Sequence, residues 1–385
     1  SGRLGEARYL FDKLPEKNVV SWGSIITGYV QHGHGVSALR LYEQMKQEGL
    51  KPDKFVLSSV FRACAKVKAS TQGSLVHIQV MFCKFRSDIV VGNSLIDMHA
   101  KCGNLETMRR VFHEMETKNA VSWGAVIAGY VQHNFCEVAL ELYMRMVQGG
   151  LKPDLLTFSC LVKACGIMGM IVKGQQIHTQ IITEGWLERN IIVGNALVDM
   201  YAKCGALVKA QNVFDTLPFR DVVSWNALIS GYAQLGRDEI VFDLFDKMLD
   251  EKKEPNLVTF TTVLNACSHA GLLEKAQMYL ETMKVQYRIN PTLEHYTCII
   301  DLFGRAGYID KASALIKEMP FSADLTVWLA LLGACQKWGN VSIGNWAFGH
   351  AVRLDEKDAA AYVCMINIYT TAGMYDDAKI IEALR

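Results

Sequence analysis

Residues 223–229 read Val-Ser-Trp-Asn-Ala-Leu-Ile, and the start of this stretch occurs twice more in the 385-residue chain. Val-Ser-Trp-Gly stands at residues 20–23 and again at residues 121–124. The three tryptophans are 101 and then 102 residues apart. Self-similarity at a fixed period is the sequence signature of a repeat protein.

Each period contains three consecutive units, of 35, 35 or 36, and 31 residues. The chain starts and stops inside a unit, so we expect further sequence on both sides. We divide it into an array over residues 1–324 and two divergent units over residues 325–385. The units are 1–18 (truncated), 19–53, 54–88, 89–119, 120–154, 155–190, 191–221, 222–256, 257–292 and 293–324, followed by 325–358 and the cut-off 359–385.

Within a unit, the apolar residues recur with the period of two helices. In the unit 19–53 they are Trp22, Ile25, Ile26 and Tyr29, and then Ala38, Leu41, Tyr42 and Met45. Gly49 and Pro52 are expected to end the second helix. One such hairpin cannot bury its apolar face alone, so about eleven of them predict an all-α solenoid of stacked hairpins of 31 to 36 residues.

Composition narrows the classes of partner. The chain has 40 Lys and Arg against 39 Asp and Glu, a formal charge of +1, which excludes a blanket attraction to nucleic acid or to an anionic membrane. Fifty per cent hydrophobic residues exclude a disordered chain. No apolar run reaches the roughly 18 residues that cross a bilayer. We therefore expect no membrane partner.

A metal or catalytic centre is not indicated by the sequence. The eleven cysteines include no Cys-x-x-Cys pair, and there is no His-x-Glu or His-Glu-x-x-His motif. Cys64, Cys165, Cys267 and Cys335 all fall at the eleventh residue of their units, which indicates packing. The histidines form no evident cluster and are expected on the surface or between helices. We expect no cofactor and no enzymatic activity in this chain.

The repeated phrases resemble the pentatricopeptide repeats of plant organelle RNA-binding proteins. Residues 223–229 and Met-Tyr-Ala-Lys-Cys-Gly at residues 200–205 carry this resemblance. The alternation of unit lengths resembles the PLS subclass, and residues 325–385 resemble its C-terminal extension motifs. The resemblance implies a right-handed superhelix that recognises a cytidine in single-stranded RNA for C-to-U editing, in a mitochondrion or chloroplast. It also implies an editing accessory protein or a deaminase as partner.

The resemblance further implies that one nucleotide is read by the fifth residue of a repeat together with its last residue. The amide and hydroxyl groups at the fifth position lie in an arc opposite the apolar one, which suits the edge of a flat base. The implied pairs are Asn93 with Asn119 for cytosine, Asn195 with Asp221 for uracil, Asn226 with Asn256 for cytosine, and Thr297 with Asp324 for guanine.

The remaining repeats are expected to read bases weakly or not at all. The L-type pairs are Ser58 with Asp88, Ser159 with Asn190, and Thr261 with Thr292. In the repeats 19–53 and 120–154, the fifth residue is Gly23 or Gly124 and the last residue is Asp53 or Asp154. Glycine offers no side-chain donor or acceptor. The resemblance places base-sandwiching side chains at the second position of the helix, namely Val20, Val90, Val121, Ile192 and Val223.

Several alternatives remain open on the sequence. Asn93 and Asn195 are also suited to capping a helix after a glycine turn, and the aspartates at the repeat ends are equally suited to capping the next helix. The recurrent tryptophans can stack on bases, although their place in the apolar arc favours the core. The rival function is a tetratricopeptide-like protein-binding scaffold, because hairpins of 34 residues form similar solenoids.

Overall fold

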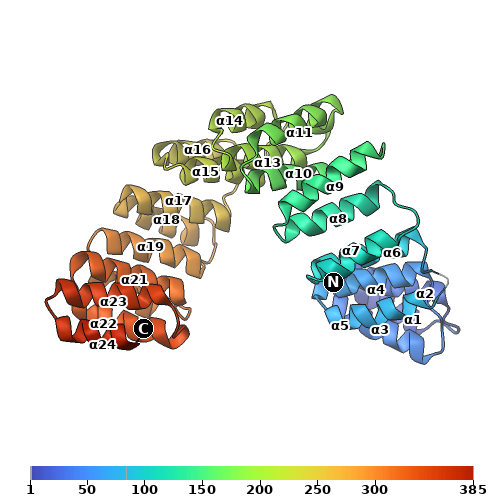
Figure 1. Cartoon of the computed structure of the whole chain (residues 1–385), viewed down its shortest axis with the longest axis horizontal. Coiled ribbons are helices and arrows are strands. Elements are labelled where there is room, and N and C mark those ends of the chain that lie inside the picture. Colours follow the sequence, from blue (N-terminus) through green and yellow to red (C-terminus); the bar gives the residue numbers. More distant parts are fainter. Residues whose placement is uncertain (1, 84, 385) are drawn as a thin grey trace. The chain divides into compact units, whose positions relative to one another are not determined.

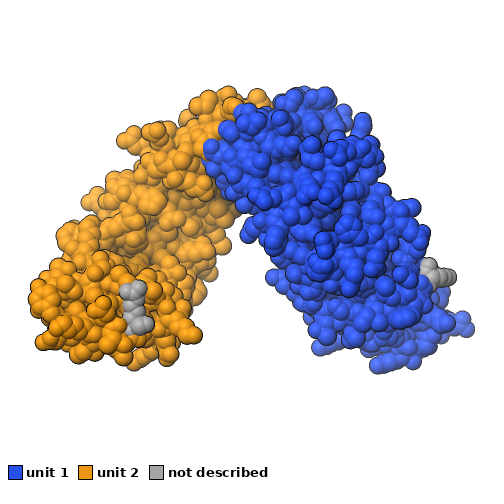
Figure 2. Space-filling view, in the orientation of Figure 1, with its two compact units in different colours: residues 1–204 blue, residues 205–385 orange. Residues whose placement is uncertain are grey.

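A computed structural model describes residues 2–83 and 85–384 of the chain (Figure 1). Ser1, Lys84 and Arg385, which fall in the predicted units 1–18, 54–88 and 359–385, lie outside the described residues. The described part contains 24 α-helices and no β-strand. It divides into two compact units, Ser1–Cys204 and Gly205–Arg385 (Figure 2).

The first unit contains five complete helical hairpins. Each has a first helix of 13 or 14 residues and a shorter or equal second helix. Its helices are α1 (Gly2–Asp12), α2 (Val19–Gln31), α3 (Gly35–Gln47), α4 (Lys54–Val67), α5 (Ser70–Met81), α6 (Ile89–Lys101), α7 (Leu105–Glu114), α8 (Ala120–Gln132), α9 (Cys136–Gln148), α10 (Leu155–Ile167), α11 (Ile171–Thr183), the short α12 (Trp186–Arg189) and α13 (Ile191–Lys203).

The second unit contains another five hairpins, preceded by one helix. The helices are α14 (Leu207–Thr216), α15 (Val222–Gln234), α16 (Asp238–Asp250), α17 (Leu257–Ala270), α18 (Leu273–Val285), α19 (Leu293–Arg305), α20 (Ile309–Glu318), α21 (Leu325–Trp338), α22 (Val341–Leu354), α23 (Ala359–Thr371) and α24 (Tyr375–Leu384). Helix α19 packs on α21 across the predicted 324/325 boundary, and the nature of residues 325–385 stays a prediction.

Stacking joins the hairpins of each unit into a solenoid. In the first unit α2 packs on α4, α4 on α6, α6 on α8, α8 on α10 and α10 on α13. In the second unit the series α15, α17, α19, α21 and α23 repeats this arrangement. Second helices pack on the first helix of their own hairpin and on that of the next. The predicted α-solenoid is therefore confirmed, with a core that continues from hairpin to hairpin.

The buried residues follow the predicted helical register. Ile26, Tyr42 and Met45 are fully buried, as the apolar spacing requires. The recurrent tryptophans pack on aromatic rings. Trp22 meets Phe11 edge to face at 4.7 Å between ring centroids, and Trp225 meets Phe214 in the same way at 4.8 Å. Such edge-to-face pairs are a favourable aromatic geometry. The structure thus confirms core packing for Trp22, Trp225 and Trp328, whereas Trp123 is half-buried and packs edge to face on Phe112.

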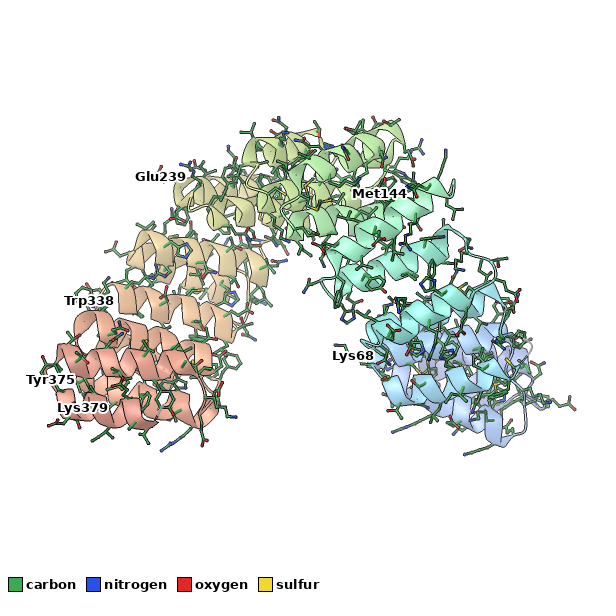
Figure 3. The ribbon with its side chains drawn as sticks, in the orientation of Figure 1. Lys68, Met144, Glu239, Trp338, Tyr375 and Lys379 are labelled. Carbon is green, nitrogen blue, oxygen red and sulfur yellow. The ribbon has the colours of Figure 1, made fainter. Side chains whose placement is uncertain are left out.

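Left-handed turns end the helices at a few positions. Gly49 follows α3 with φ +75°, as expected, and Lys68 takes φ +52° after α4 (Figure 3). Gly307 has φ +85°, and a Cβ there would lie 3.2 Å from the ring of Trp338, which is also labelled in Figure 3. Both the backbone and the ring therefore require glycine at residue 307.

The cysteines in mid-helix are buried packing residues. Cys64, Cys165, Cys267 and Cys335 are fully inaccessible to solvent. Burial raises the pKa of Cys267 to about 12, so its thiol stays protonated at neutral pH. These side chains are inert components of the core.

Two histidines form a buried contact that the sequence analysis did not predict. His99 Nε2 on α6 lies 3.0 Å from His77 Nδ1 on α5. The equivalent contact one period later joins His178 Nδ1 on α11 to the hydroxyl of Tyr201 on α13, at 2.9 Å. These histidines lie between helices, as expected, and hairpin packing adds a pairing of residues 22 positions apart that spacing alone does not show.

Candidate nucleic-acid interface

Every predicted residue at the end of a repeat caps the first helix of the next repeat. The backbone at each cap is extended, and the side chain of most of them accepts a backbone N–H from the first turn. These caps are Asp53, Asp88, Asn119, Asp154, Asn190, Asp221, Asn256, Thr292 and Asp324. The capping interpretation of the aspartates is confirmed, and asparagines and a threonine share it.

The predicted residues at the fifth position lie inside their helices. Asn93 is the fifth residue of α6 and Asn195 the fifth of α13, so the interpretation of these two as helix caps is wrong. Asn195 is only 8% exposed and Asn226 only 9%. These two amides are therefore largely covered by neighbouring side chains, although they lie opposite the apolar arc of their own helices.

Asn226 and Asn256 contact each other directly. Asn226 Nδ2 donates to Asn256 Oδ1 at 3.0 Å, and Thr259 Oγ1 donates to Asn226 Oδ1 at 2.7 Å. Asn256 Oδ1 also accepts the backbone N–H of Thr259 at 3.1 Å. The predicted pair is thus one hydrogen-bonded group, and Thr259, the third residue of α17, completes it. The sequence analysis did not identify Thr259.

Asn93 and Asn119 are linked through a similar residue. Ser122, the third residue of α8, donates its hydroxyl to Asn93 Oδ1 at 2.7 Å. Its backbone N–H donates to Asn119 Oδ1 at 3.0 Å. The serine therefore connects the fifth residue of one repeat to the cap that follows it.

Asn195 and Asp221 belong to different compact units. Asn195 lies on α13 in the first unit. In the second unit, Asp221 caps α15, with Oδ1 accepting the backbone N–H of Ser224 at 2.9 Å. Ser224 is the third residue of its helix, as Ser122 and Thr259 are of theirs.

Thr297 and Asp324 line one cavity of about 570 Å³ in the second unit. Thr297 donates its hydroxyl to the backbone oxygen of Leu293 at 2.8 Å, and Asp324 accepts the N–H of Val327 at 3.0 Å. The two side chains do not contact each other directly, but both border the same space. Its volume lies in the range of small-ligand sites.

In the repeat 257–292, a histidine bridges the predicted residues. His295 Nδ1 lies 2.7 Å from the hydroxyl of Thr292, and its Nε2 lies 3.2 Å from that of Thr261. The backbone N–H of Thr292 also donates to Nδ1, so the ring proton is on Nε2. Burial lowers the pKa of His295, which keeps the ring neutral at pH 7.

The pairs predicted in the repeats 54–88 and 155–190 are not brought together by side-chain hydrogen bonds. Ser58 contacts Ser94 at 2.7 Å, and Ser159 donates to a backbone oxygen of its own helix. Burial alone raises the pKa of Asp88, but two backbone N–H groups and the ammonium of Lys54 outweigh it and leave that pKa lowered. Asp88 is therefore an ionised acceptor.

The two glycines at the fifth position leave no room for a side chain. A Cβ on Gly23 would lie 3.2 Å from Val56, and one on Gly124 would lie 2.7 Å from the hydroxyl of Thr157. That hydroxyl donates instead to the carboxylate of Asp154 at 2.7 Å. In these two repeats, Asp53 and Asp154 cap the next helix, and the fifth residue supplies no side chain to bond with them.

The predicted base-sandwiching residues are all exposed apolar side chains. This holds for Val20, Val90, Val121, Ile192 and Val223. The same second position is also apolar and exposed in the repeats 54–88, 155–190 and 257–292, at Phe55, Leu156 and Val258, which were not among the predicted residues. Phe55, Leu156 and Val258 could have been predicted from the sequence, because each is the second residue of its helix, as the valines are. Exposed apolar residues that recur once per helix form a periodic surface rather than a core.

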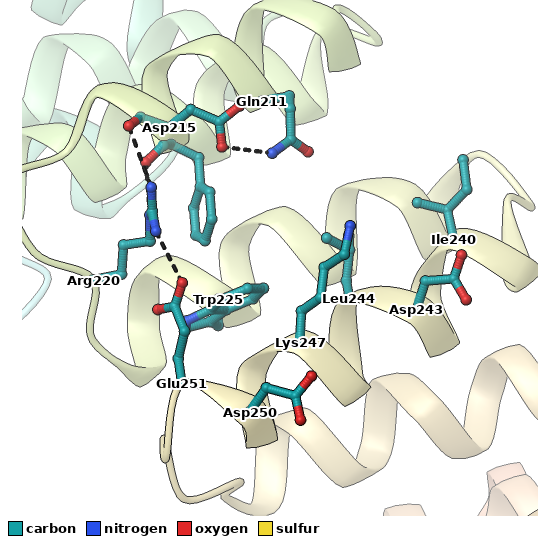
Figure 4. Close-up of a pocket in the computed structure, with 11 residues that line it drawn as sticks. Gln211, Asp215, Arg220, Trp225, Ile240, Asp243, Leu244, Lys247, Asp250 and Glu251 are labelled. Carbon is teal, nitrogen blue, oxygen red and sulfur yellow. Dashed lines mark hydrogen bonds and ion pairs between the residues drawn. The ribbon is translucent and has the colours of Figure 1, made fainter.

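A separate cavity of about 380 Å³ lies among α14, α15 and α16 (Figure 4). Arg220 donates to the carboxylate of Glu251 at 2.9 Å there. In the repeat 19–53, Trp22 Nε1 donates to Glu48, whereas Trp225 Nε1 has no partner among the described residues. Arg220 thus binds Glu251, the carboxylate that would otherwise accept a hydrogen bond from Trp225 Nε1. None of the predicted base-reading residues lines this cavity.

Residues 2–83 and 85–384 contain no group of three or more His, Cys, Asp or Glu side chains placed to hold a metal ion. They also contain no helix of sufficient length and apolarity to cross a membrane.

Comparison with known families and proteins identifies the repeats. Family models for the PPR repeat together match more than half of the chain. One matches residues 17–66, 118–166 and 220–269, and another matches residues 93–119, 258–286 and 294–322.

Curated relatives match along the whole chain. A mitochondrial pentatricopeptide repeat-containing protein of Arabidopsis thaliana is 37% identical, over 98% of this chain and 59% of its own length. A putative pentatricopeptide repeat-containing protein of the same plant is 39% identical, over 100% of this chain and 52% of its own length. The chain spans little more than half of these two relatives.

Solved structures support the fold. Pentatricopeptide repeat protein PPR10, in complex with an 18-nucleotide psaJ RNA element, matches with a TM-score of 0.71 and 18% identity, over 100% of this chain and 62% of that one. PPR10 from maize matches with a TM-score of 0.56 and 17% identity, over 99% of this chain and 65% of that one. With the repeated sequence, the stacked hairpins and the family-model matches, these findings establish that the chain belongs to the pentatricopeptide repeat family.

Proposed function

We propose that this chain binds single-stranded RNA in a sequence-specific manner, one nucleotide per repeat. In this proposal it is the site-recognition part of an organellar C-to-U RNA editing factor of the PLS subclass. Solved relatives of the same fold hold RNA, as the PPR10 complex does, which supports the choice of partner.

The hydrogen bonds of Asn226 and Asn256 are the observation that carries the proposal. Both amide oxygens are occupied: Asn226 Oδ1 by Thr259, and Asn256 Oδ1 by Asn226 and Thr259. The hydrogen-bonding capacity that remains on the pair is therefore mainly that of N–H donors, since only one lone pair of Asn226 Oδ1 is left unused. Cytosine has two adjacent acceptors, N3 and O2, whereas uracil has a donor at N3. A pair of donors favours cytosine over uracil.

The donors and acceptors of two other repeats likewise indicate which base each would bind. Asp221 has only acceptor oxygens, which suit the N3–H of uracil. Asp324, beside the cavity that it shares with Thr297, suits guanine, whose N1–H and N2–H₂ groups are adjacent donors. In the repeats 191–221 and 222–256, the exposed Ile192 and Val223 at the second position provide the flat contact that an unpaired base requires, whereas the repeat 293–324 has Glu294 there.

The activity of a longer protein is part of the same proposal. We infer that it acts in a mitochondrion or chloroplast, and the mitochondrial names of several relatives favour the former. A deaminase or an editing accessory protein is the proposed partner. This chain lacks the Cys-x-x-Cys and His-x-Glu motifs of zinc deaminases, so we expect it to leave cytidine unchanged, with or without added zinc.

Selection from a random single-stranded RNA pool tests partner, register and base choice together. Read in the order of the repeats from residue 89 to residue 324, the expected enrichment is C-N-N-U-C-N-G, where N is any base. Failure to retain any RNA, or retention without positional preference, contradicts the proposal. Binding of extended peptides in place of RNA would instead favour the tetratricopeptide-like scaffold.

A further inference from the structure

A hydroxyl residue follows every asparagine at the fifth position, at one fixed place in the next repeat. Ser122 follows Asn93, Ser224 follows Asn195 and Thr259 follows Asn226, each as the third residue of the next first helix. Where the fifth residue is serine or threonine, the equivalent residue has no hydroxyl: it is Val91, Val193, His295 or Val327. The asparagine and the hydroxyl therefore occur together within this chain.

The contacts of Thr259 explain the association. Its backbone N–H can only donate, so Asn256 must turn Oδ1 toward it and Nδ2 away. Asn226 lies against that same oxygen and must present Nδ2 to it, at 3.0 Å. The remaining Asn226 Oδ1 then meets the Thr259 hydroxyl at 2.7 Å.

The single hydroxyl proton of Thr259 goes to Asn226. The alternative acceptor, Asn256 Oδ1, is farther away at 3.1 Å and already takes two N–H groups. Thr259 is completely buried, so water cannot replace this bond. Without the hydroxyl, the buried Asn226 Oδ1 would lose its donor, and the single bond from Nδ2 to Asn256 Oδ1 would be left to hold the amide, so that Asn226 is less firmly fixed and can leave Asn256 to turn its oxygen toward a ligand.

We propose that Thr259 is a positioning residue for base choice, which fixes both amides of the Asn226–Asn256 pair with their N–H groups toward the base. This inference rests on the proposed RNA-binding function and adds a third residue to the pair Asn226 and Asn256. Ser122 has the same role for Asn93, where its hydroxyl lies 2.7 Å from Oδ1.

The test compares Thr259→Val with the wild-type chain on four RNAs that differ only at the nucleotide of the repeat 222–256. Wild type should prefer cytosine by about 10- to 100-fold. Thr259→Val should reduce that preference to less than about 3-fold, because an Asn226 amide released from its place can offer its oxygen as well as its N–H groups and so match either pyrimidine. Thr259→Ser keeps the hydroxyl and should retain the preference.

Thr157→Val is the matched control. Thr157 has the same helical position, is equally buried and hydrogen-bonds to its cap, but the fifth residue before it is Gly124. This variant loses a capping hydroxyl without releasing an amide, so base preference should stay as in wild type at every nucleotide. Ser122→Ala repeats the positive test at the repeat 89–119.

The outcomes separate this inference from the function on which it rests. If Thr259→Val weakens binding of all four RNAs equally, Thr259 is only a cap and the inference is wrong. If Asn256→Asp shifts the preference while Thr259→Val leaves it unchanged, the inference again fails but base reading stands. If wild type itself does not discriminate among the four RNAs, both fail.

Discussion

The last residue of each repeat combines two roles at the scale of one side chain. Asn256 uses Oδ1 to accept the N–H of Thr259 and so caps α17, while its Nδ2 is left for a ligand. Aspartate caps a helix about as well as asparagine. The cap and the ligand-facing atom can therefore be changed separately.

Asn256→Asp should move the base preference of the repeat 222–256 from cytosine toward uracil. The new carboxylate keeps an oxygen for the cap but replaces a donor with an acceptor, which matches the N3–H of uracil. Asn226→Thr should move the preference toward a purine. We expect changes of about one to two orders of magnitude in relative affinity at that nucleotide alone. Titration with RNAs that vary at one position measures this, and uniform weakening by both variants would contradict it.

Val223→Ala should weaken binding of RNA with any base at that nucleotide. Val223 is 57% exposed, so its loss costs the fold little, whereas a base that rests on it loses apolar contact worth about 1 kcal/mol. Val208→Ala is the control, because Val208 is 75% exposed but lies on the second-helix segment α14. Equal affinity losses in the two variants would show that the second position has no special contact with RNA.

Pairs of helices determine the titration behaviour of the buried histidines. His99 is 1% exposed and lies between α5 and α6. Burial lowers its pKa to about 4, and the neighbouring His77 and Arg110 contribute in the same direction. The unfolded chain therefore binds a proton at His99 near its ordinary pKa of about 6.5, while the folded chain does not.

The free energy of unfolding should consequently fall as the pH decreases from about 7 to 5. The His99 contribution is present above the unfolded pKa and is lost toward the folded one, on the order of 1–2 kcal/mol over this range. His99→Tyr copies the equivalent Tyr201 and should flatten the pH dependence while keeping a hydrogen bond to His77. Urea unfolding at several pH values measures the slope. An equal flattening by substitution of the exposed His113 would contradict the assignment.

At the scale of the molecule, recognition depends on unpaired bases more than on charge. The net charge is +1, so few counterions are expected to be released on binding. Each proposed contact requires a free base edge and a free base face, which a duplex does not offer.

We therefore expect strong preference for single-stranded RNA over the duplex of the same sequence, with a shallow dependence of affinity on salt. Competition in a filter-binding titration at several salt concentrations measures both. Equal affinity for the duplex, or a steep salt dependence, would point to phosphate contacts as the main source of binding.

The sequence alone determined the repeat lengths, the helical hairpins and the positions of the candidate site residues. These features depend on local spacing: an apolar period fixes which face of a helix is buried, and a polar residue before a helix caps it. Val20, Asn93 and Asp221 were placed in this way, and most of the recurrent tryptophans were correctly assigned to the core.

Only the tertiary structure showed which polar groups meet between neighbouring repeats. Thr259 and Asn226 are 33 residues apart, and His99 and His77 are 22 apart, so their contacts depend on how closely the helices stack. Burial of Asn226 likewise results from its neighbour Asn256, which belongs to the following helix as its cap. Sequence spacing places a residue on a face, whereas packing distance determines its partner and the orientation of its amide.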